Sequence, residues 1–244
     1  MLEPLFQPFL IEFLVPSAST YADDIDFLWE LIFWVVGAWF LAVEGIFFWL
    51  MFKFSKKNSP KAQYITGELQ SEKKYISYPH MAVLVFDILI LVFAVKVWYD
   101  VKQDLPPAES SVRVITQQWA WTFQNAGPDG KLDTPDDITT MNELHVEVGT
   151  LYHYKLESLD VLHDFSVPVF RLKQDAIPGR VITGWFEPTL TGEYDIQCAE
   201  ICGIGHGLMG ARIHIETPEQ HAAWMASQAP ISLASATPGV GAEE

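Results

Sequence analysis

Two long apolar segments separated by a polar stretch dominate the first hundred residues of the chain. Residues 27–52 and residues 81–99 each contain only two charged side chains. A helix needs about 20 apolar residues to cross the hydrocarbon of a bilayer, so the pattern predicts a hairpin of two membrane-spanning helices. The polar residues 53–80 carry six lysines, whereas residues 1–26 carry no lysine or arginine. The positive-inside rule therefore places the connecting loop in the cytoplasm and both ends of the chain on the outer side.

The pattern then changes to short segments in which apolar and polar residues alternate. After a linker at residues 100–111, we expect strands at residues 112–116, 145–148, 152–156, 181–186, 193–198 and 211–215. Short strands separated by turns that contain Gly and Pro favour an all-β sandwich or barrel, which we place at residues 112–227. Residues 228–244 are rich in Ala, Ser, Pro and Gly and are expected to be disordered.

The charge of the chain limits its partners. The net charge is −16 at pH 7, which argues against nucleic acid because the phosphate backbone attracts basic proteins. Residues 100–244 carry 21 acidic and 8 basic residues. Such a domain attracts a basic protein electrostatically, although an acidic surface also keeps a protein soluble.

Both cysteines lie in one segment with the spacing C-x3-C-x3-H-x2-M, formed by Cys198, Cys202, His206 and Met209. Thiolate, imidazole and thioether are soft ligands, which suit copper better than magnesium or calcium. His163 offers a second imidazole. A mononuclear blue-copper site needs only one cysteine. Two thiolates, two imidazoles, a thioether and a backbone carbonyl are enough for two copper ions bridged by two sulfurs.

Two simpler interpretations compete with copper. Two cysteines in an exported domain most often form a disulfide, and a zinc site also uses cysteine and histidine. The combination with histidine and methionine favours copper over both. Glycines at 203, 205 and 207 are expected to let the segment turn tightly, so that its side chains converge. No C-x-x-C-H motif for covalent haem attachment occurs.

The segment resembles the dinuclear copper A loop of subunit II of haem–copper cytochrome c oxidases. The resemblance implies a cupredoxin-like Greek-key domain in which the two cysteines bridge both coppers. His163 and His206 would bind one copper each. Met209 would bind one copper, and the backbone carbonyl of Glu200 would bind the other. In this family the side chain at the Glu200 position also helps bind a magnesium ion against subunit I.

Two further stretches resemble the same family. The run Gln-Trp-Ala-Trp that ends at Trp121 resembles an aromatic stretch whose first tryptophan receives the electron from cytochrome c, a role that falls on Trp119. Trp121 is expected to pack in the core. Glu72 resembles a glutamate at the mouth of a proton path into subunit I. Tyr75 and Ile76 replace the Trp-Thr pair of the family pattern, so a solvated loop glutamate is the alternative.

Other charged residues match the family by position. Asp160 and Asp175 fall where family members carry acidic residues near the docking face and the interface with subunit I. Arg180 is expected at that interface, where it would pair with a haem propionate or an acidic residue. The remaining histidines of the predicted β domain match no ligand position and are expected to be structural: His145, His153, His214 and His221.

A turn-rich acidic insertion occupies residues 125–137. Four aspartates there offer oxygen ligands to calcium: Asp129, Asp133, Asp136 and Asp137. The insertion lacks the full EF-hand spacing and its final bidentate glutamate. A solvated hairpin is the alternative.

The resemblance implies an electron-transfer subunit of a bacterial respiratory terminal oxidase, anchored in the inner membrane with its β domain in the periplasm. Copper A would take electrons from a c-type cytochrome and pass them to haem in subunit I, where oxygen is reduced to water and protons are pumped. Three alternatives are a quinol oxidase subunit II, which lacks the copper ligands, a membrane-anchored copper carrier or assembly protein, and the soluble copper A domain of nitrous oxide reductase. The two predicted spans argue against the last.

Overall fold

The computed structural model describes residues 10–59, 61 and 65–228. The sequence predicts disorder for residues 228–244, of which residues 229–244 lie outside the described residues, whereas Gln228 is helical. The chain divides into two compact units, of which one contains Tyr21–Leu105 and the other contains Pro106–Glu244 together with the short segment Ser17–Thr20. That segment joins the second unit through its backbone. Ala18 donates a hydrogen bond to the Val169 carbonyl at 2.8 Å and accepts one from the Thr189 amide at 2.9 Å.

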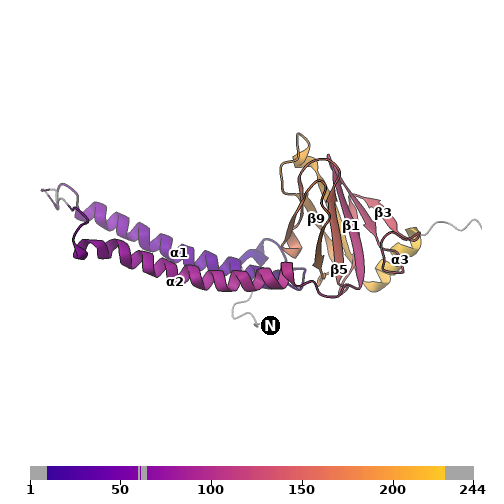
Figure 1. Cartoon of the computed structure of the whole chain (residues 1–244), viewed down its shortest axis with the longest axis horizontal. Coiled ribbons are helices and arrows are strands. Elements are labelled where there is room, and N and C mark those ends of the chain that lie inside the picture. The colour runs from indigo at the N-terminus through magenta and orange to yellow at the C-terminus, as the bar shows by residue number, and fades with distance from the viewer. Residues whose placement is uncertain (1–9, 60, 62–64, 229–244) are drawn as a thin grey trace, which may run out of the picture. The chain divides into compact units, whose positions relative to one another are not determined.

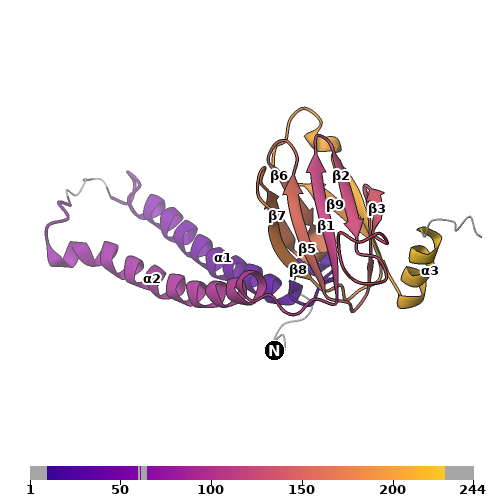
Figure 2. The ribbon, with the colours of Figure 1, turned by 45° about the vertical axis from the view of Figure 1, so that its right-hand side comes forward.

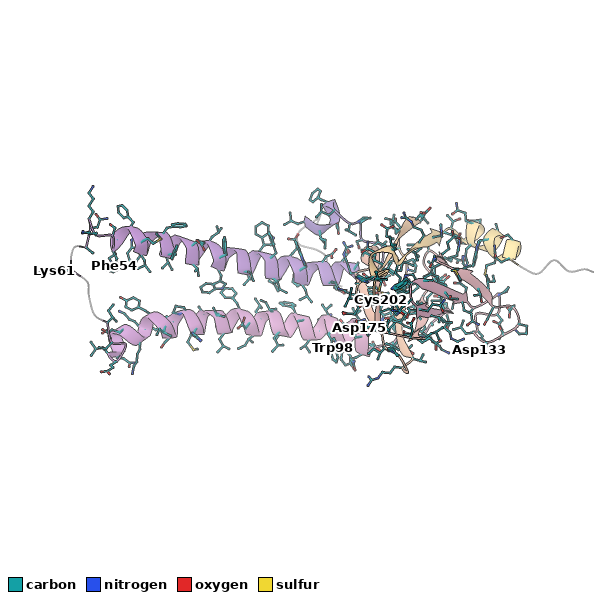
Figure 3. All side chains as sticks on the ribbon, turned by 90° about the horizontal axis from the view of Figure 1, so that it is seen from above. Phe54, Lys61, Trp98, Asp133, Asp175 and Cys202 are labelled. Atoms are coloured by element: carbon teal, nitrogen blue, oxygen red, sulfur yellow. The ribbon has the colours of Figure 1, made fainter. Side chains whose placement is uncertain are left out.

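The first unit is built on two long helices that contact each other over part of their length and diverge towards the segment that connects them (Figures 1 and 2). Helix α1 spans Ala22–Lys53, and helix α2 spans Gln70–Trp98 and continues into a π-helical turn, η2, at Tyr99–Gln103. Phe27 and Phe93 meet edge to face, with 5.4 Å between ring centroids. Many apolar side chains project outward from both helices (Figure 3), an arrangement that is costly in water and favourable in lipid. Both helices are long and apolar enough to cross a membrane, as the sequence predicted. A short 3-10 helix, η1 (Leu10–Phe13), precedes them.

Helix α2 begins earlier than the sequence suggested. Residues 70–80 were expected to belong to a polar loop, but they are helical, and Pro79 lies inside the helix. Polar residues indicate which part of the chain lies outside the hydrocarbon of the membrane. They do not end a helix, because Gln, Glu and Lys are good helix formers in water. Glu72 lies in the first turn of α2, where a negative charge is favourable. Its carboxylate accepts a hydrogen bond from the Gly67 amide at 2.9 Å.

The second unit is a sandwich of two five-stranded sheets, with strand orders β3-β2-β1-β5-β8 and β4-β10-β9-β6-β7 (Figure 2). The strands of the first sheet are β1 (Ser110–Gln117), β2 (Ala120–Asn125), β3 (Ile138–Met141), β5 (Tyr152–Ser158) and β8 (Ile182–Phe186). Those of the second sheet are β4 (Glu143–Glu147), β6 (His163–Val167), β7 (Leu172–Ala176), β9 (Gly192–Cys198) and β10 (Gly210–Glu216). Helix α3 (Pro218–Gln228) follows the last strand, and 3-10 turns lie at η3 (Pro168–Phe170) and η4 (His206–Leu208).

Aromatic side chains fill the space between the sheets. Trp121, Phe123 and Phe165 are fully buried, and the rings of Trp121 and Phe165 lie 5.6 Å apart. Alternating burial along β1 and β5 follows from the period of two residues in a strand. The predicted fold class, a pair of membrane-type helices followed by an all-β sandwich, is confirmed.

All six predicted strands exist, but the sequence missed four others and the helix α3. Strands β6 and β7 carry polar residues at positions that the alternation rule assigns to apolar ones, and β6 begins with three consecutive buried residues. Strand β2 lies within the aromatic stretch, and β3 has only four residues. Short or polar strands give a weak periodic signal. Helix α3 has only Trp224 and Met225 as large apolar side chains, too few to reveal a helical period.

Candidate metal centre

The two strands β9 and β10 carry the loop that holds most of the predicted ligands, orange at the upper end of the sandwich in Figure 1. Cys198 is the last residue of β9, and Met209 immediately precedes β10. His163 is the first residue of β6, which pairs with β9 in a register that sets Phe165 opposite Cys198. Strand pairing therefore brings a histidine from a distant part of the sequence to the loop.

Four donor groups surround two free cysteine sulfurs, which makes six potential ligands in all. The Sγ atoms of Cys198 and Cys202 lie 3.7 Å apart and do not form a disulfide. The Nδ1 atom of His163 lies 3.9 Å from Cys198 Sγ, and the Glu200 carbonyl oxygen lies 3.2 Å from the same sulfur. On the other side, Cys202 Sγ lies 3.6 Å from Nδ1 of His206 and 3.8 Å from Sδ of Met209. His163, Cys202 and Met209 are buried, so the donors form an enclosed soft-ligand site.

Asp160 fixes the orientation of His163. Its Oδ1 atom lies 2.9 Å from His163 Nε2, so that Nδ1 faces the sulfurs. The carboxylate also accepts hydrogen bonds from the backbone amides of Gln118 at 2.7 Å and Val161 at 2.6 Å. Burial raises the pKa of Asp160, but these hydrogen bonds outweigh it, and the net pKa is lowered. The aspartate is an ionised anchor of the kind that commonly supports a metal-binding imidazole.

The thiol of Cys202 is protonated at neutral pH in the absence of a cation. Burial, and next the adjacent Cys198, raise its pKa to about 11. A metal ion must displace that proton, as it does at other thiolate sites. The donor set therefore fits a soft cation bound by both sulfurs, and the separation of the sulfurs excludes the predicted alternative of a disulfide in this conformation.

Trp119 lies against the loop that carries the cysteines. Its Nε1 atom donates a hydrogen bond to the Cys202 carbonyl at 3.2 Å, and the Gln118 side chain donates to the same oxygen at 2.8 Å. The side chain is nevertheless 39% exposed. The indole of Trp119 is thus exposed to solvent on one side and hydrogen-bonded to the backbone of Cys202 on the other. Trp121, by contrast, is fully buried, as the sequence predicted.

The three glycines of the loop have different roles. Gly203 has φ +115°, a conformation that strongly favours glycine, and a Cβ there would lie 2.9 Å from the side-chain amide nitrogen of Gln118. Gly205 has an ordinary backbone conformation, but a Cβ there would overlap the indole of Trp119. Gly207 has open space around it. Only Gly203 supports the expectation of a tight turn, and Gly205 instead permits the close approach of Trp119.

Asp164 is a buried carboxyl next to the centre that the sequence did not reveal. It lies opposite Asp175 in the β6–β7 register, and its Oδ1 atom has no hydrogen-bond partner. Burial, and next the carboxyl of Asp175, raise the pKa of Asp164 to about 6. The folded state therefore binds a proton that the unfolded state has already released, and the carboxyl lowers stability as pH rises from about 4 to about 6.

Replacing Asp164 with asparagine is expected to stabilise the β domain at neutral pH. The amide keeps the shape of the carboxyl and removes a buried charge, so the free energy of unfolding should rise by about 1–2 kcal/mol at pH 7. The gain should shrink as the pH falls to about 4 and below, where the carboxyl becomes protonated in the unfolded state as well. Thermal unfolding of the full chain in detergent measures this, and an equal gain at both pH values would show that the charge is not the cause.

The remaining predicted residues lie at varied distances from the centre. Asp175 and Arg180 are exposed, on β7 and in the turn that follows it. In the acidic insertion, Arg113 forms a two-pronged ion pair with Asp133 at 2.8 and 3.0 Å. Asp137 accepts a hydrogen bond from Gln124 at 2.6 Å. The insertion lies away from the loop that carries the cysteines, as the positions of Asp133 and Cys202 in Figure 3 indicate. Neighbouring side chains thus already contact the carboxylates of Asp133 and Asp137. Calcium binding at the insertion stays a prediction.

Sequence comparison places the β domain in a known family. Residues 110–216 match the family model described as the periplasmic domain of cytochrome c oxidase subunit II. The alternative cytochrome c oxidase subunit 2 of Bradyrhizobium diazoefficiens is 31% identical over 230 residues, which cover 85% of this chain and 80% of that protein. Cytochrome c oxidase subunit 2 of Thermostichus vulcanus is 40% identical over 129 residues, 53% of this chain and 36% of that protein.

A solved structure is similar over the β domain. The periplasmic domain of subunit II of cytochrome oxidase from Bradyrhizobium japonicum has 27% sequence identity and a TM-score of 0.46, and the match covers 51% of this chain and 96% of that one.

Two helices long and apolar enough to cross a membrane and a β-sandwich with an enclosed set of soft ligands are the features of a membrane-anchored protein that could bind a metal. The relatives make the assignment specific, because one of them is more than 30% identical over most of both chains. The chain belongs to the cytochrome c oxidase subunit II family, whose members are subunits of a haem–copper oxidoreductase.

Proposed function

We propose that this chain is the subunit that receives electrons for a respiratory haem–copper oxidase, through a dinuclear copper A centre in its β domain. The observation that carries the proposal is the convergence of four further donor groups on two free sulfurs that lie 3.7 Å apart. When bound, the dinuclear copper centre supplies a one-electron carrier between a c-type cytochrome and the haem of subunit I. The oxygen chemistry and proton pumping would then belong to the partner subunit.

The ligand residues would share the work of holding the centre. Cys198 and Cys202 would bridge the metal ions, and His163 and His206 would each bind one. Met209 and the Glu200 carbonyl would complete the ligand set. These are the roles that the resemblance to the family implies. Because His163 and Cys198 lie on paired strands, the protein keeps these ligands fixed, which limits the reorganisation that accompanies a change of oxidation state.

The surroundings of the centre would link it to its partners. Trp119 would receive the electron from the donor cytochrome, and the acidic surface, which includes Asp160 and Asp175, would attract that donor. Arg180 would lie against subunit I, and the side chain of Glu200 would help bind magnesium there. The chain would be anchored in the inner membrane of a bacterium. Its β domain, residues 112–227, and both ends of the chain would lie in the periplasm. Glu72 would then face the cytoplasm at the mouth of a proton path.

Copper content and electron paramagnetic resonance of the purified full chain test the proposal. Two copper ions that share one unpaired electron give hyperfine structure from two equivalent nuclei. One copper per chain, zinc, or a disulfide between the two cysteines in reconstituted protein would contradict it. The copper carrier would instead release its metal readily to a chelator.

Replacing Asp160 with asparagine is expected to weaken copper binding while the fold persists. Only the oxygen of an asparagine side-chain amide accepts hydrogen bonds, whereas both carboxylate oxygens of Asp160 do. Either His163 or the Gln118 backbone therefore loses its acceptor. Loss of a residue that orients a ligand typically lowers metal affinity by about 10–100-fold. Competition with a copper chelator at fixed pH measures the change. The variant Asp175→Asn is the matched control, and an equal loss in both variants would indicate a general effect of surface charge.

A further inference from the structure

The outer face of the second sheet carries a cluster of histidines and glutamates that the proposed function does not use. His145 on β4 lies opposite His214 on β10, and His214 in turn lies opposite Glu193 on β9. Glu143, two residues before His145 on β4, points to the same face because side chains alternate along a strand. Strand pairing thus gathers residues that the sequence separates widely and that match no copper A ligand.

Glu143, His145 and His214 each offer one ligand atom, and these three atoms lie within 4.8 Å of one another. Two imidazoles and a carboxylate form the ligand set of many zinc sites that keep a fourth position open. Imidazole also excludes magnesium and calcium as the preferred ions, since these prefer oxygen. The composition of the cluster therefore points to a borderline-soft divalent ion.

Glu216 holds His145 in the orientation that a metal ligand needs. Its Oε1 atom lies 2.8 Å from His145 Nδ1, which leaves Nε2 available. Its Oε2 atom lies 2.9 Å from Nδ1 of His221 on α3. A carboxylate that engages the second nitrogen of an imidazole is the usual support for histidine bound to zinc. Burial lowers the pKa of His145, so its imidazole is neutral at neutral pH, the form that binds a metal.

The cluster combines one rigid ligand with two adjustable ones. The ring of His145 is stacked between those of His214, at 4.5 Å, and Trp224 of α3, at 4.2 Å. His214 and Glu143 are more exposed. Zinc–nitrogen bonds of 2.0–2.1 Å set two ligand nitrogens about 3.4 Å apart. The lone pairs of the two nearly parallel imidazoles lie in separate planes, so a shared ion requires that the His214 ring turn out of the stack and that Glu143 rotate towards His145.

The cluster is open to solvent on one side. A hollow of about 430 Å³ is lined by His214, Glu193 and Glu216 of the sheet and by Gln220 of α3. Of the three proposed ligands the hollow reaches His214, and it gives an ion a path to that imidazole. Glu193 adds negative charge beside this path, with Oε2 4.0 Å from His214 Nδ1.

We propose that Glu143, His145 and His214 form a zinc site on the outer face of the β4–β10 pair, supported by Glu216 and separate from the copper A centre. Zinc would tie β4 to β10 and, through Glu216 and His221, strengthen the attachment of α3. A ligand that binds only the folded state stabilises it, so zinc should raise the unfolding temperature of the β domain.

Zinc titration of the full chain in detergent, by calorimetry, tests the proposal. The copper loop is kept out of the measurement in two ways, by loading it with copper or by using the double variant Cys198→Ser, Cys202→Ser. The second background makes the test independent of copper A. We expect one zinc ion per chain in both backgrounds, a higher unfolding temperature with zinc, and an unchanged copper spectrum in the first background.

Three substitutions separate a built site from adventitious binding. His214→Gln should lower zinc affinity by about 100-fold or more, and Glu216→Gln, which removes only the support of His145, by about 10–100-fold. His153→Gln is the matched control, because His153 lies on the other sheet, where its Nε2 atom meets the Pro106 carbonyl at 2.8 Å. The proposal is overturned if no stoichiometric zinc binds in either background, or if His153→Gln and His214→Gln have equal effects.

Discussion

Replacing Cys202 with serine is expected to remove the two-copper signature and nearly all oxidation of the cytochrome donor. Cys202 is the buried sulfur at the middle of the site, within 3.8 Å of Cys198, His206 and Met209. A serine hydroxyl is a hard, weakly acidic donor and cannot bridge two copper ions as a thiolate does. Since loss of a mere supporting residue costs about 10–100-fold, loss of a bridging ligand should cost more than about 100-fold in activity.

The companion variants decide whether the site holds one metal or two. Cys198→Ser should have the same effect as Cys202→Ser, because a dinuclear centre needs both sulfurs. Met209→Leu keeps the volume and removes only the thioether, so it should retain two coppers with an altered reduction potential. Copper stoichiometry, paramagnetic resonance and cytochrome oxidation of each variant give the comparison. A mononuclear blue-copper site would survive the loss of one cysteine, and that result would contradict the dinuclear assignment.

The sequence predicted the candidate metal centre because most of the proposed ligands lie within one short segment. Cys198, Cys202, His206 and Met209 are close in the chain, so their spacing alone indicated a site. His163 was first considered only as a possible second imidazole, and the resemblance to a family then implied its role as a ligand. Its position depends on the pairing of β6 with β9, which no local pattern encodes.

Features that depend on strand register could not be predicted. Asp164 meets Asp175, and His145 meets His214, only because their strands pair in a particular register. Read alone, each of these residues has an ordinary strand environment. The two membrane-type helices were predicted because a long apolar run is a local property. The predicted start of α2 was wrong because polar residues extend the helix beyond the apolar run.

Replacing Trp119 with alanine is expected to slow electron transfer from the cytochrome donor while the copper spectrum stays intact. The indole is partly exposed and donates a hydrogen bond to the Cys202 carbonyl. It contributes no ligand atom, so its removal should spare the metal. A fall of about tenfold or more in the second-order rate corresponds to about 1.4 kcal/mol or more in the barrier. Stopped-flow oxidation of the reduced cytochrome by the assembled oxidase measures it.

The contact between Trp119 and Gly205 gives this prediction a sharper form. A Cβ at residue 205 would overlap the indole, so Gly205→Ala should displace the ring and also slow electron transfer. If the electron passes through this contact, Gly205→Ala should add little in the Trp119→Ala background, because interacting residues are not additive. Gly207→Ala, where a Cβ meets open space, is the matched control and should transfer electrons at the normal rate. A normal rate in Trp119→Ala itself would remove the role from this residue and leave the indole as a support for the loop.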